Sequence, residues 1–175
     1  MKIRETAEEG VYHVYGYCID GQEFFRDPVV KQKIIKTFEK AKTRHSFIIQ
    51  NFIIMNDHYH YVIQTGRTES ISVIMHWILT VIAIYINIRF KRHGPVCTSR
   101  FKSKLIKTLR YFFNVFRYIN RNPVKAGLVK RADDWQYGGL WHFKKRDMTL
   151  IGNNPDWVYC LYRKSWVLFD LFYLF

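Results

Sequence analysis

The segment that most constrains the fold of this chain is residues 71–88, which contain no charged side chain. A segment of this length and composition forms either a transmembrane helix or a helix that is largely buried in a protein core. His76, Thr80, Ala83 and Asn87 recur at helical spacing, which places small and polar side chains along one side of such a helix. The sequence has no second span of this kind, and its mean hydropathy is −0.19. We therefore expect a core helix and no association with a membrane.

The segments around this helix predict an α+β protein. β-Branched and aromatic residues gather in segments bounded by turn residues, as is typical of strands. Apolar residues at helical spacing predict a helix that opens at Pro28 and another that stops before Pro123, since the residue before proline disfavours the α conformation. The expected strands are residues 11–19, 46–55 and 58–65, and the expected helices are residues 28–44, 71–88 and 103–122. This order predicts a ferredoxin-like antiparallel sheet with the helices packed on one face.

Chain length and cysteine usage set the domain organisation and the compartment. We expect one domain over residues 1–146, followed by an aromatic tail over residues 147–175 whose role the sequence does not indicate. Cys18, Cys97 and Cys160 form no CxxC pair, so neither a disulfide framework nor a structural zinc site is supported. The N-terminal residues are charged and do not form a signal peptide. These features favour a cytoplasmic protein.

The charge distribution indicates a polyanionic partner. Lys and Arg number 28 against 14 Asp and Glu, a formal net charge of +14, and residues 70–132 contain no acidic residue. A solvated helix face normally mixes both signs, so one-signed charge of this extent favours nucleic acid over a generically basic surface, which is the alternative. The candidate nucleic-acid-binding residues are Arg89, Lys91, Arg92, Arg100, Lys102, Lys104, Lys107, Arg110, Arg117 and Arg121.

Two histidines stand in the third expected strand. His58 and His60 are separated by one residue, so their side chains project to the same face about 7 Å apart. Two neutral imidazoles in this arrangement can chelate one divalent ion. The pattern is short, and the alternative is one packing histidine beside one that is exposed by chance.

The last expected helix carries two apolar stripes. Leu109, Phe112, Phe113, Phe116 and Ile119 form the expected core stripe. Tyr111, Val115, Tyr118 and Asn122 form a separate stripe, on which a tyrosine hydroxyl and an amide one turn apart can face a common site. The alternative for Tyr118 is an aromatic residue that caps the core.

The stretches NDHYHYVI and RYINRNPVKAGLV together resemble the single-tyrosine HUH transposases of insertion sequences, and most closely the REP-associated tyrosine transposases. HUH denotes two histidines around a bulky hydrophobic residue, here Tyr59. The family nucleophile lies five residues before the proline of an Asn-Pro motif, which corresponds to Tyr118 before Pro123. The likeness spans residues 10–141 and includes RFKS at residues 100–103, which is similar to a basic element of the family.

The resemblance implies a function. It implies that His58, His60 and Asn122 hold Mg²⁺ or Mn²⁺, that Tyr118 forms a phosphotyrosine with single-stranded DNA beside a hairpin or palindromic element, and that the protein is a monomer or homodimer. The rejoining step then needs no ATP, because the covalent link conserves the bond energy. Two alternatives are a non-catalytic binder of single-stranded nucleic acid and a metal-dependent hydrolase that uses water as its nucleophile.

Overall fold

The computed structural model describes residues 5–171, and side chains are described up to Lys164. Residues 1–4 of the expected domain and residues 172–175 of the expected tail lie outside the described residues. The elements of the first half are β1 (Val11–Tyr17), α1 (Pro28–Lys42), β2 (Phe47–Ile54), β3 (His58–Thr65) and α2 (Ile71–Arg89). They are followed by β4 (Lys102–Leu105), α3 (Leu109–Lys125), α4 (Gly139–Lys144) and α5 (Asp156–Leu171), and short 3-10 turns cover Ile19–Gly21, Phe24–Arg26 and Ala132–Asp134.

The four strands form one antiparallel sheet in the order β2-β3-β1-β4. With α1 between β1 and β2 and α2 between β3 and β4, this is the βαββαβ arrangement of a ferredoxin-like sheet, which confirms the expected fold class. The register pairs Tyr15 of β1 with His60 of β3 and with Lys102 of β4. Side chains of three neighbouring strands therefore share one face at this level of the sheet.

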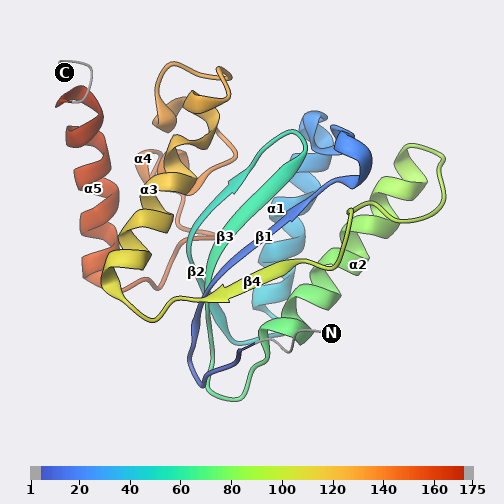
Figure 1. Cartoon of the computed structure of the whole chain (residues 1–175), viewed down its shortest axis with the longest axis horizontal. Coiled ribbons are helices and arrows are strands. Elements are labelled where there is room, and N and C mark those ends of the chain that lie inside the picture. The colour runs from blue at the N-terminus through green and yellow to red at the C-terminus, as the bar shows by residue number, and fades with distance from the viewer. Residues whose placement is uncertain (1–4, 172–175) are drawn as a thin grey trace.

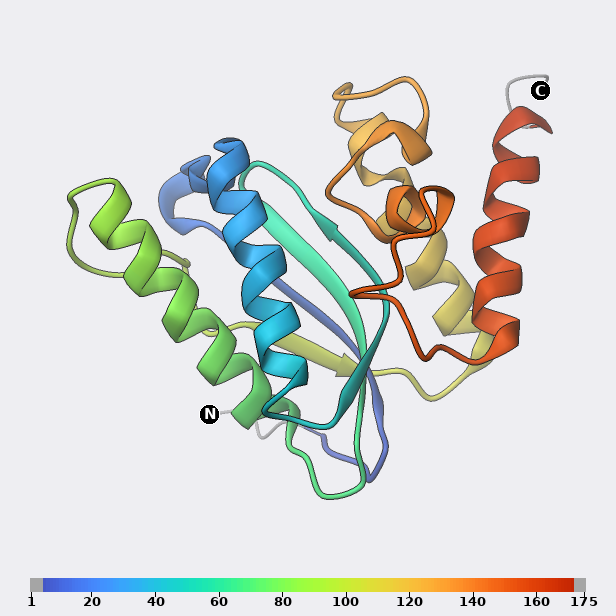
Figure 2. The same cartoon turned by 180° about the vertical axis from the view of Figure 1, so that it is seen from behind.

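Helices α1 and α2 cover one face of the sheet (Figures 1 and 2). Helix α1 begins where the sequence indicated, because Asp27 caps its N-terminus by accepting a hydrogen bond from the Val29 amide at 2.8 Å. Helix α2 buries Ile74, Ile78, Ile82 and Ile86 in the core. Val73, Ile84 and Ile88 are exposed, so the helix is less buried than its composition predicts. It is also the one helix among the described residues that is long and apolar enough to span a membrane.

Helix α3 packs on the opposite face, which corrects the expectation that all helices share one face (Figures 1 and 2). A buried amide pair ties it to the sheet: Asn51 Nδ2 of β2 donates to Asn120 Oδ1 at 3.0 Å and to the Phe116 carbonyl at 3.4 Å. The face that a helix covers depends on the length and direction of its connection, and strand order alone does not specify either.

The bounds of α3 differ from the predicted 103–122 at both ends. Residues 102–105 pair with β1 as an edge strand, and Thr108 caps the helix by accepting from the Tyr111 amide at 3.2 Å. At the other end Pro123 lies inside the helix, because proline removes only one hydrogen bond from the last turns. The helix ends in a Schellman motif, in which the amides of Gly127 and Leu128 donate to the carbonyls of Val124 and Pro123. Gly127 has a φ of +68°, which only glycine adopts without strain.

The apolar stripe of α3 is also shifted from the prediction. Phe112, Val115, Phe116 and Ile119 are buried, while Leu109 and Phe113 of the expected core stripe are exposed. The sequence pattern predicts Val115 on the same stripe as Tyr118, but Val115 is buried. The rest of that stripe therefore lies at the border between the buried side of the helix and the solvent.

Residues from 137 onward cover the outer edge of β2. Ile54 donates its amide to the Tyr137 carbonyl at 2.9 Å, and the Asn154 side chain donates to the Ile49 carbonyl at 2.9 Å. The Tyr162 hydroxyl of α5 donates to the Gln50 carbonyl at 2.8 Å. The edge of β2 is thus bonded to side chains and backbone from the last third of the chain.

Candidate functional site

Strand β3 presents His58 and His60 on the face that α3 covers. Their ring centroids are 5.3 Å apart and the rings are nearly perpendicular. His60 is only 2% exposed, whereas His58 is half-buried at the end of the strand. The alternation of the strand thus places both imidazoles where the sequence predicted them.

Helix α3 brings Tyr118 to this pair. The Tyr118 side chain is 46% exposed, and its ring meets His60 edge to face with the centroids 5.2 Å apart. Asn122, one turn later, donates from Nδ2 to the Tyr118 carbonyl at 3.0 Å. Because Nδ2 is engaged in this way, the amide oxygen Oδ1 is the atom that Asn122 can offer to a ligand.

A third histidine, which the sequence pattern did not single out, contacts the pair. His13 of β1 is 8% exposed, and its Nε2 lies 3.0 Å from His60 Nδ1. The two rings are stacked, with centroids 5.2 Å apart and an interplanar angle of 24°. The signal that could have found it is period-two alternation, since residues 13, 15 and 17 share a face of β1, but the partner strand was not known from sequence.

Both histidines of β3 use Nδ1 for a protein contact. His58 Nδ1 lies 2.6 Å from Asp57 Oδ1, and His60 Nδ1 is the atom next to His13. His60 Nε2 is buried and has no hydrogen-bond partner among the described residues. The arrangement leaves Nε2 of each imidazole for another ligand, as is usual where histidines bind metal.

Burial keeps two of the imidazoles neutral. It lowers the pKa of His60 to about 3, with smaller effects from His13 and His58, and lowers the pKa of His13 to about 4, with a smaller effect from Lys104. The neutral imidazole is the form that coordinates a cation. Near neutral pH His60 therefore needs no deprotonation before a metal binds, and the neighbouring His13 adds no positive charge.

Two tyrosines of β1 extend the aromatic surface. Tyr15 stacks on His60 with centroids 5.6 Å apart, and Tyr17 stacks on His58 at 5.2 Å. Tyr17 is 43% exposed. Burial raises its pKa, and the neighbouring Tyr118 adds to the effect. Tyr17 is therefore a second hydroxyl close to the histidine pair.

Comparison with known proteins decides the family. The sequence profile described as transposase, IS200-like, matches residues 6–122, which is more than half of the chain. This chain belongs to the IS200-like transposase family. The likeness found in the sequence motifs is thereby confirmed.

A solved structure has a similar fold. It is the structure of the REP-associated tyrosine transposase bound to a REP hairpin, and it matches this transposase with a TM-score of 0.71 and 18% sequence identity. The match covers 83% of this chain and 86% of that chain. At this level of identity the likeness shows the fold alone. No curated protein sequence matches the chain.

The candidate DNA-binding residues of this transposase fall into two groups. Lys102 and Lys104 of β4 share the face of Tyr15 and His13, and Arg117 and Arg121 of α3 line a groove of about 500 Å³ together with Tyr118. Arg110 lies in the first turn of the same helix, and Lys107, just before it, pairs with Glu5.

The remaining basic residues lie away from the histidines. Arg89 of α2 bonds Asp27 at 2.6 Å, and the Arg92 side chain donates to Asn87 and to the Pro95 carbonyl. Lys91 lies beside them in the turn after α2. Arg100 lines a cavity on the other face of the sheet. The structure therefore gathers Lys102, Lys104, Arg117 and Arg121 around the site and places the other group on the α2 layer.

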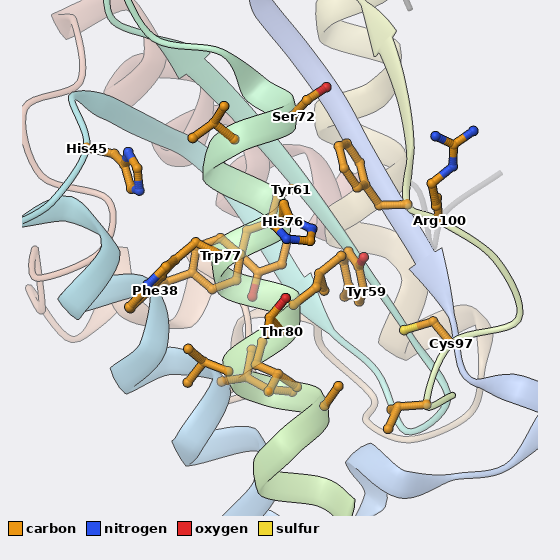
Figure 3. Close-up of a pocket in the computed structure, with 18 of the residues that line it drawn as sticks. Phe38, His45, Tyr59, Tyr61, Ser72, His76, Trp77, Thr80, Cys97 and Arg100 are labelled. Atoms are coloured by element: carbon orange, nitrogen blue, oxygen red, sulfur yellow. The ribbon is translucent and has the colours of Figure 1, made fainter. Parts of the chain in front are cut away.

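That cavity, of about 970 Å³, lies between α2 and the sheet (Figure 3). Tyr59 and Tyr61 of β3 form part of its wall, and His76, Trp77 and Thr80 line it from α2 (Figure 3). Because alternate residues of β3 face opposite ways, the cavity is separated from His58 and His60 by the sheet itself. It is therefore not part of the candidate site of the transposase.

Proposed function

We propose that this transposase cleaves and rejoins single-stranded DNA beside a hairpin, with Tyr118 as the covalent nucleophile. The observation that carries the proposal is the edge-to-face contact of Tyr118 with His60, next to two imidazoles whose Nδ1 atoms are both engaged. A hairpin substrate is supported by the related solved structure, which is bound to a REP hairpin.

His58, His60 and Asn122 would hold Mg²⁺ or Mn²⁺. The buried His60 Nε2, which has no partner among the described residues, and the neutral state of its ring suit such an ion. The described part of the chain contains no group of three or more His, Cys, Asp or Glu that could hold a metal, and the third protein ligand that we propose is the amide oxygen of Asn122. When bound, the ion polarises the scissile phosphate and offsets the charge that develops on it.

The reaction exchanges one phosphate ester for another. The Tyr118 oxygen attacks phosphorus and loses its proton, while the bond between phosphorus and the 3′ oxygen breaks and that oxygen gains a proton. The products are a 5′-phosphotyrosine and a free 3′-hydroxyl, and attack by a 3′-hydroxyl on the phosphotyrosine reverses the step. Arg117 and Arg121, which line the groove beside Tyr118, would hold neighbouring phosphates in place.

The test is covalent trapping. The protein is incubated with Mn²⁺ and single-stranded oligonucleotides that carry a hairpin, and adducts are separated on denaturing gels and mapped by mass spectrometry. We expect an adduct on Tyr118, and none with Tyr118→Phe, which keeps the ring but lacks the hydroxyl. Tyr17→Phe and Tyr111→Phe are the matched controls, and both should still form the adduct.

Three outcomes would contradict the proposal in different ways. An adduct on Tyr17 or Tyr111 would assign the nucleophile to another residue. Strand cleavage without an adduct would favour water as the nucleophile. Binding without cleavage of any substrate would favour a descendant that has kept only its affinity for DNA.

The metal ligands make a second prediction. His58→Ala and His60→Ala should each abolish adduct formation while DNA affinity stays within a few-fold, because basic residues supply most of that affinity. Asn122→Ala should retain part of the activity, since water or phosphate can fill one coordination position. The measurements are adduct yield and a binding titration on the same oligonucleotide. Full activity of the double histidine variant would remove the metal assignment.

A further inference from the structure

The contact between His13 and His60 joins the proposed metal site to a residue on the neighbouring strand. His13 Nε2 and His60 Nδ1 are 3.0 Å apart, a distance at which one nitrogen donates and the other accepts. Both rings are buried and stacked on each other. His13 Nε2 is turned to His60, so His13 is a neighbour of a proposed ligand and not itself a ligand.

The hydrogen bond between His13 Nε2 and His60 Nδ1 can have its proton on either nitrogen, and the two cases differ in whether His60 can bind a metal. If His13 Nε2–H donates, neutral His60 carries its own proton on Nε2, and that atom has no lone pair for a metal. If His60 Nδ1–H donates, His13 accepts and His60 Nε2 keeps its lone pair. One hydrogen bond therefore decides whether His60 can act as a ligand.

We propose that His13 is a positioning residue, which accepts the Nδ1–H of His60 and thereby holds His60 in the tautomer and orientation that bind the metal. The inference rests on the proposed function. It is supported by His60 Nε2, which is buried and has no acceptor among the described residues to receive a proton placed there. A buried N–H without an acceptor is unfavourable, whereas an unshared lone pair is what a cation requires.

Ring stacking fixes the orientation of the His60 ring, in addition to the hydrogen bond that fixes the position of its proton. His13 and Tyr15 both lie nearly parallel to His60, at interplanar angles of 24° and 28°, and the Tyr118 ring is nearly perpendicular to it. Rotation of the His60 ring would break the hydrogen bond to His13. Such partners of a metal-binding histidine typically change metal affinity ten- to a hundredfold when they are removed.

The first measurement is metal affinity in the absence of DNA. His13→Phe keeps a ring of similar shape and removes the acceptor, and His13→Gln keeps an acceptor oxygen. Titration with Mn²⁺, followed by electron paramagnetic resonance of the free ion, should show about a ten- to hundredfold weaker affinity for His13→Phe. His13→Gln should stay within a few-fold of the unmodified protein. Equal affinity of His13→Phe and the unmodified protein would overturn the inference.

The second measurement uses the unmodified protein without metal, so its result does not depend on whether a variant folds. Imidazole nitrogen chemical shifts of the metal-free protein, obtained with ¹⁵N-labelled histidine, distinguish a ring protonated on Nδ1 from one protonated on Nε2. We expect His60 to carry its proton on Nδ1 and His13 to have an unprotonated Nε2. A proton on His60 Nε2 would overturn the inference.

The two measurements separate this inference from the function on which it rests. If the unmodified protein binds no Mn²⁺, the proposed metal site fails, and the nitrogen shifts still decide which histidine donates. If metal binds and the shifts place the proton on His60 Nε2, the metal site stands and the role of His13 is wrong.

Discussion

At the scale of single residues, burial prepares the site. His13 and His60 lie between the sheet and α3, where the charged imidazolium is poorly solvated, so both remain neutral well below the usual pH range for histidine. The same burial that stabilises the fold thus maintains the form of the side chain that coordination requires. This coupling has a measurable thermodynamic consequence.

Stability of the metal-free protein should decrease as the pH falls below about 6.5. Burial lowers the pKa of His60 to about 3 and of His13 to about 4, whereas both titrate near 6.5 in the unfolded chain. Between these values the unfolded chain binds protons that the folded protein does not, so the free energy of unfolding drops by up to about 1.4 kcal/mol per pH unit for each histidine. Urea unfolding at pH 7, 6 and 5 measures it.

A matched pair of variants isolates this effect. His60→Asn should flatten the dependence on pH, and His76→Asn, at an exposed position of α2, should leave it unchanged. Equal slopes for His60→Asn and the unmodified protein would show that another group causes the loss of stability.

The sequence was sufficient to place some site residues and not others. His58 and His60 were predicted to share a face because strand alternation is local, and Tyr118 and Asn122 because helical spacing is local. His13 and Tyr17 were missed, since their contacts with β3 depend on the register between strands far apart in the chain. The roles of all these residues stay predictions until the experiments above are done.

At the scale of elements, the position of α3 depends on one buried amide. Asn51 of β2 donates to α3 through Nδ2, and its Oδ1 accepts from the Phe52 amide at 2.8 Å and from the Tyr162 hydroxyl at 3.2 Å. A single side chain thus fixes a strand, α3 and α5 relative to one another. Tyr118 lies about half a turn from the α3 residues that Asn51 contacts, Phe116 and Asn120.

Asn51→Ala should therefore destabilise the protein and displace Tyr118, the proposed nucleophile. The change leaves the buried Phe52 amide without its partner, so we expect a loss of about 2 to 4 kcal/mol in the free energy of unfolding. Adduct yield should fall under conditions in which the variant is still folded, as checked by circular dichroism. The control is Gln32→Ala, at an exposed position of α1. An unchanged free energy of unfolding would mean that the amide pair does not hold α3.

Elements were predicted best where caps and periodicity agreed. The helix at Pro28 and the strand at residues 58–65 begin where expected, because a proline after Asp27 and a tight turn mark those starts. The sequence predicts a helix for residues 103–105, because their pairing with β1 is non-local and leaves no local signal. The sequence predicts that the helix stops before Pro123, but it ends just before Gly127, four residues later, where φ is positive.

At the scale of the whole molecule, basic residues differ in how much they should contribute to DNA binding. Lys102 and Lys104 lie on the face of the histidine pair, whereas Lys36 and Lys40 are exposed on α1, in the layer on the opposite face. A net charge of +14 attracts a polyanion from any side. Only basic residues close to the bound DNA strand should contribute to the salt dependence of the affinity.

Affinity for single-stranded DNA should fall steeply with salt, by about 0.7 logarithmic units per contacted phosphate for each tenfold rise in salt. Charge reversal of Lys102 and Lys104 to Glu should flatten this slope. The same reversal of Lys36 and Lys40 changes the net charge equally and should leave the slope close to that of the unmodified protein. Fluorescence anisotropy over a range of salt concentrations measures it, and identical slopes for the two variants would point to generic basicity.

Strand β4 has a further consequence for handling the protein. Of the two edge strands, β2 is bonded to residues from the last third of the chain, whereas β4 has no such bonds within residues 5–171. Strand β4 is four residues long and carries Lys102 and Lys104. Unpaired edges are templates for intermolecular β-pairing, and short length and lysine charge are common defences against aggregation. Replacement of these lysines by glutamate keeps a charge on the edge, whereas valine would turn the same strand into a nucleus for self-association.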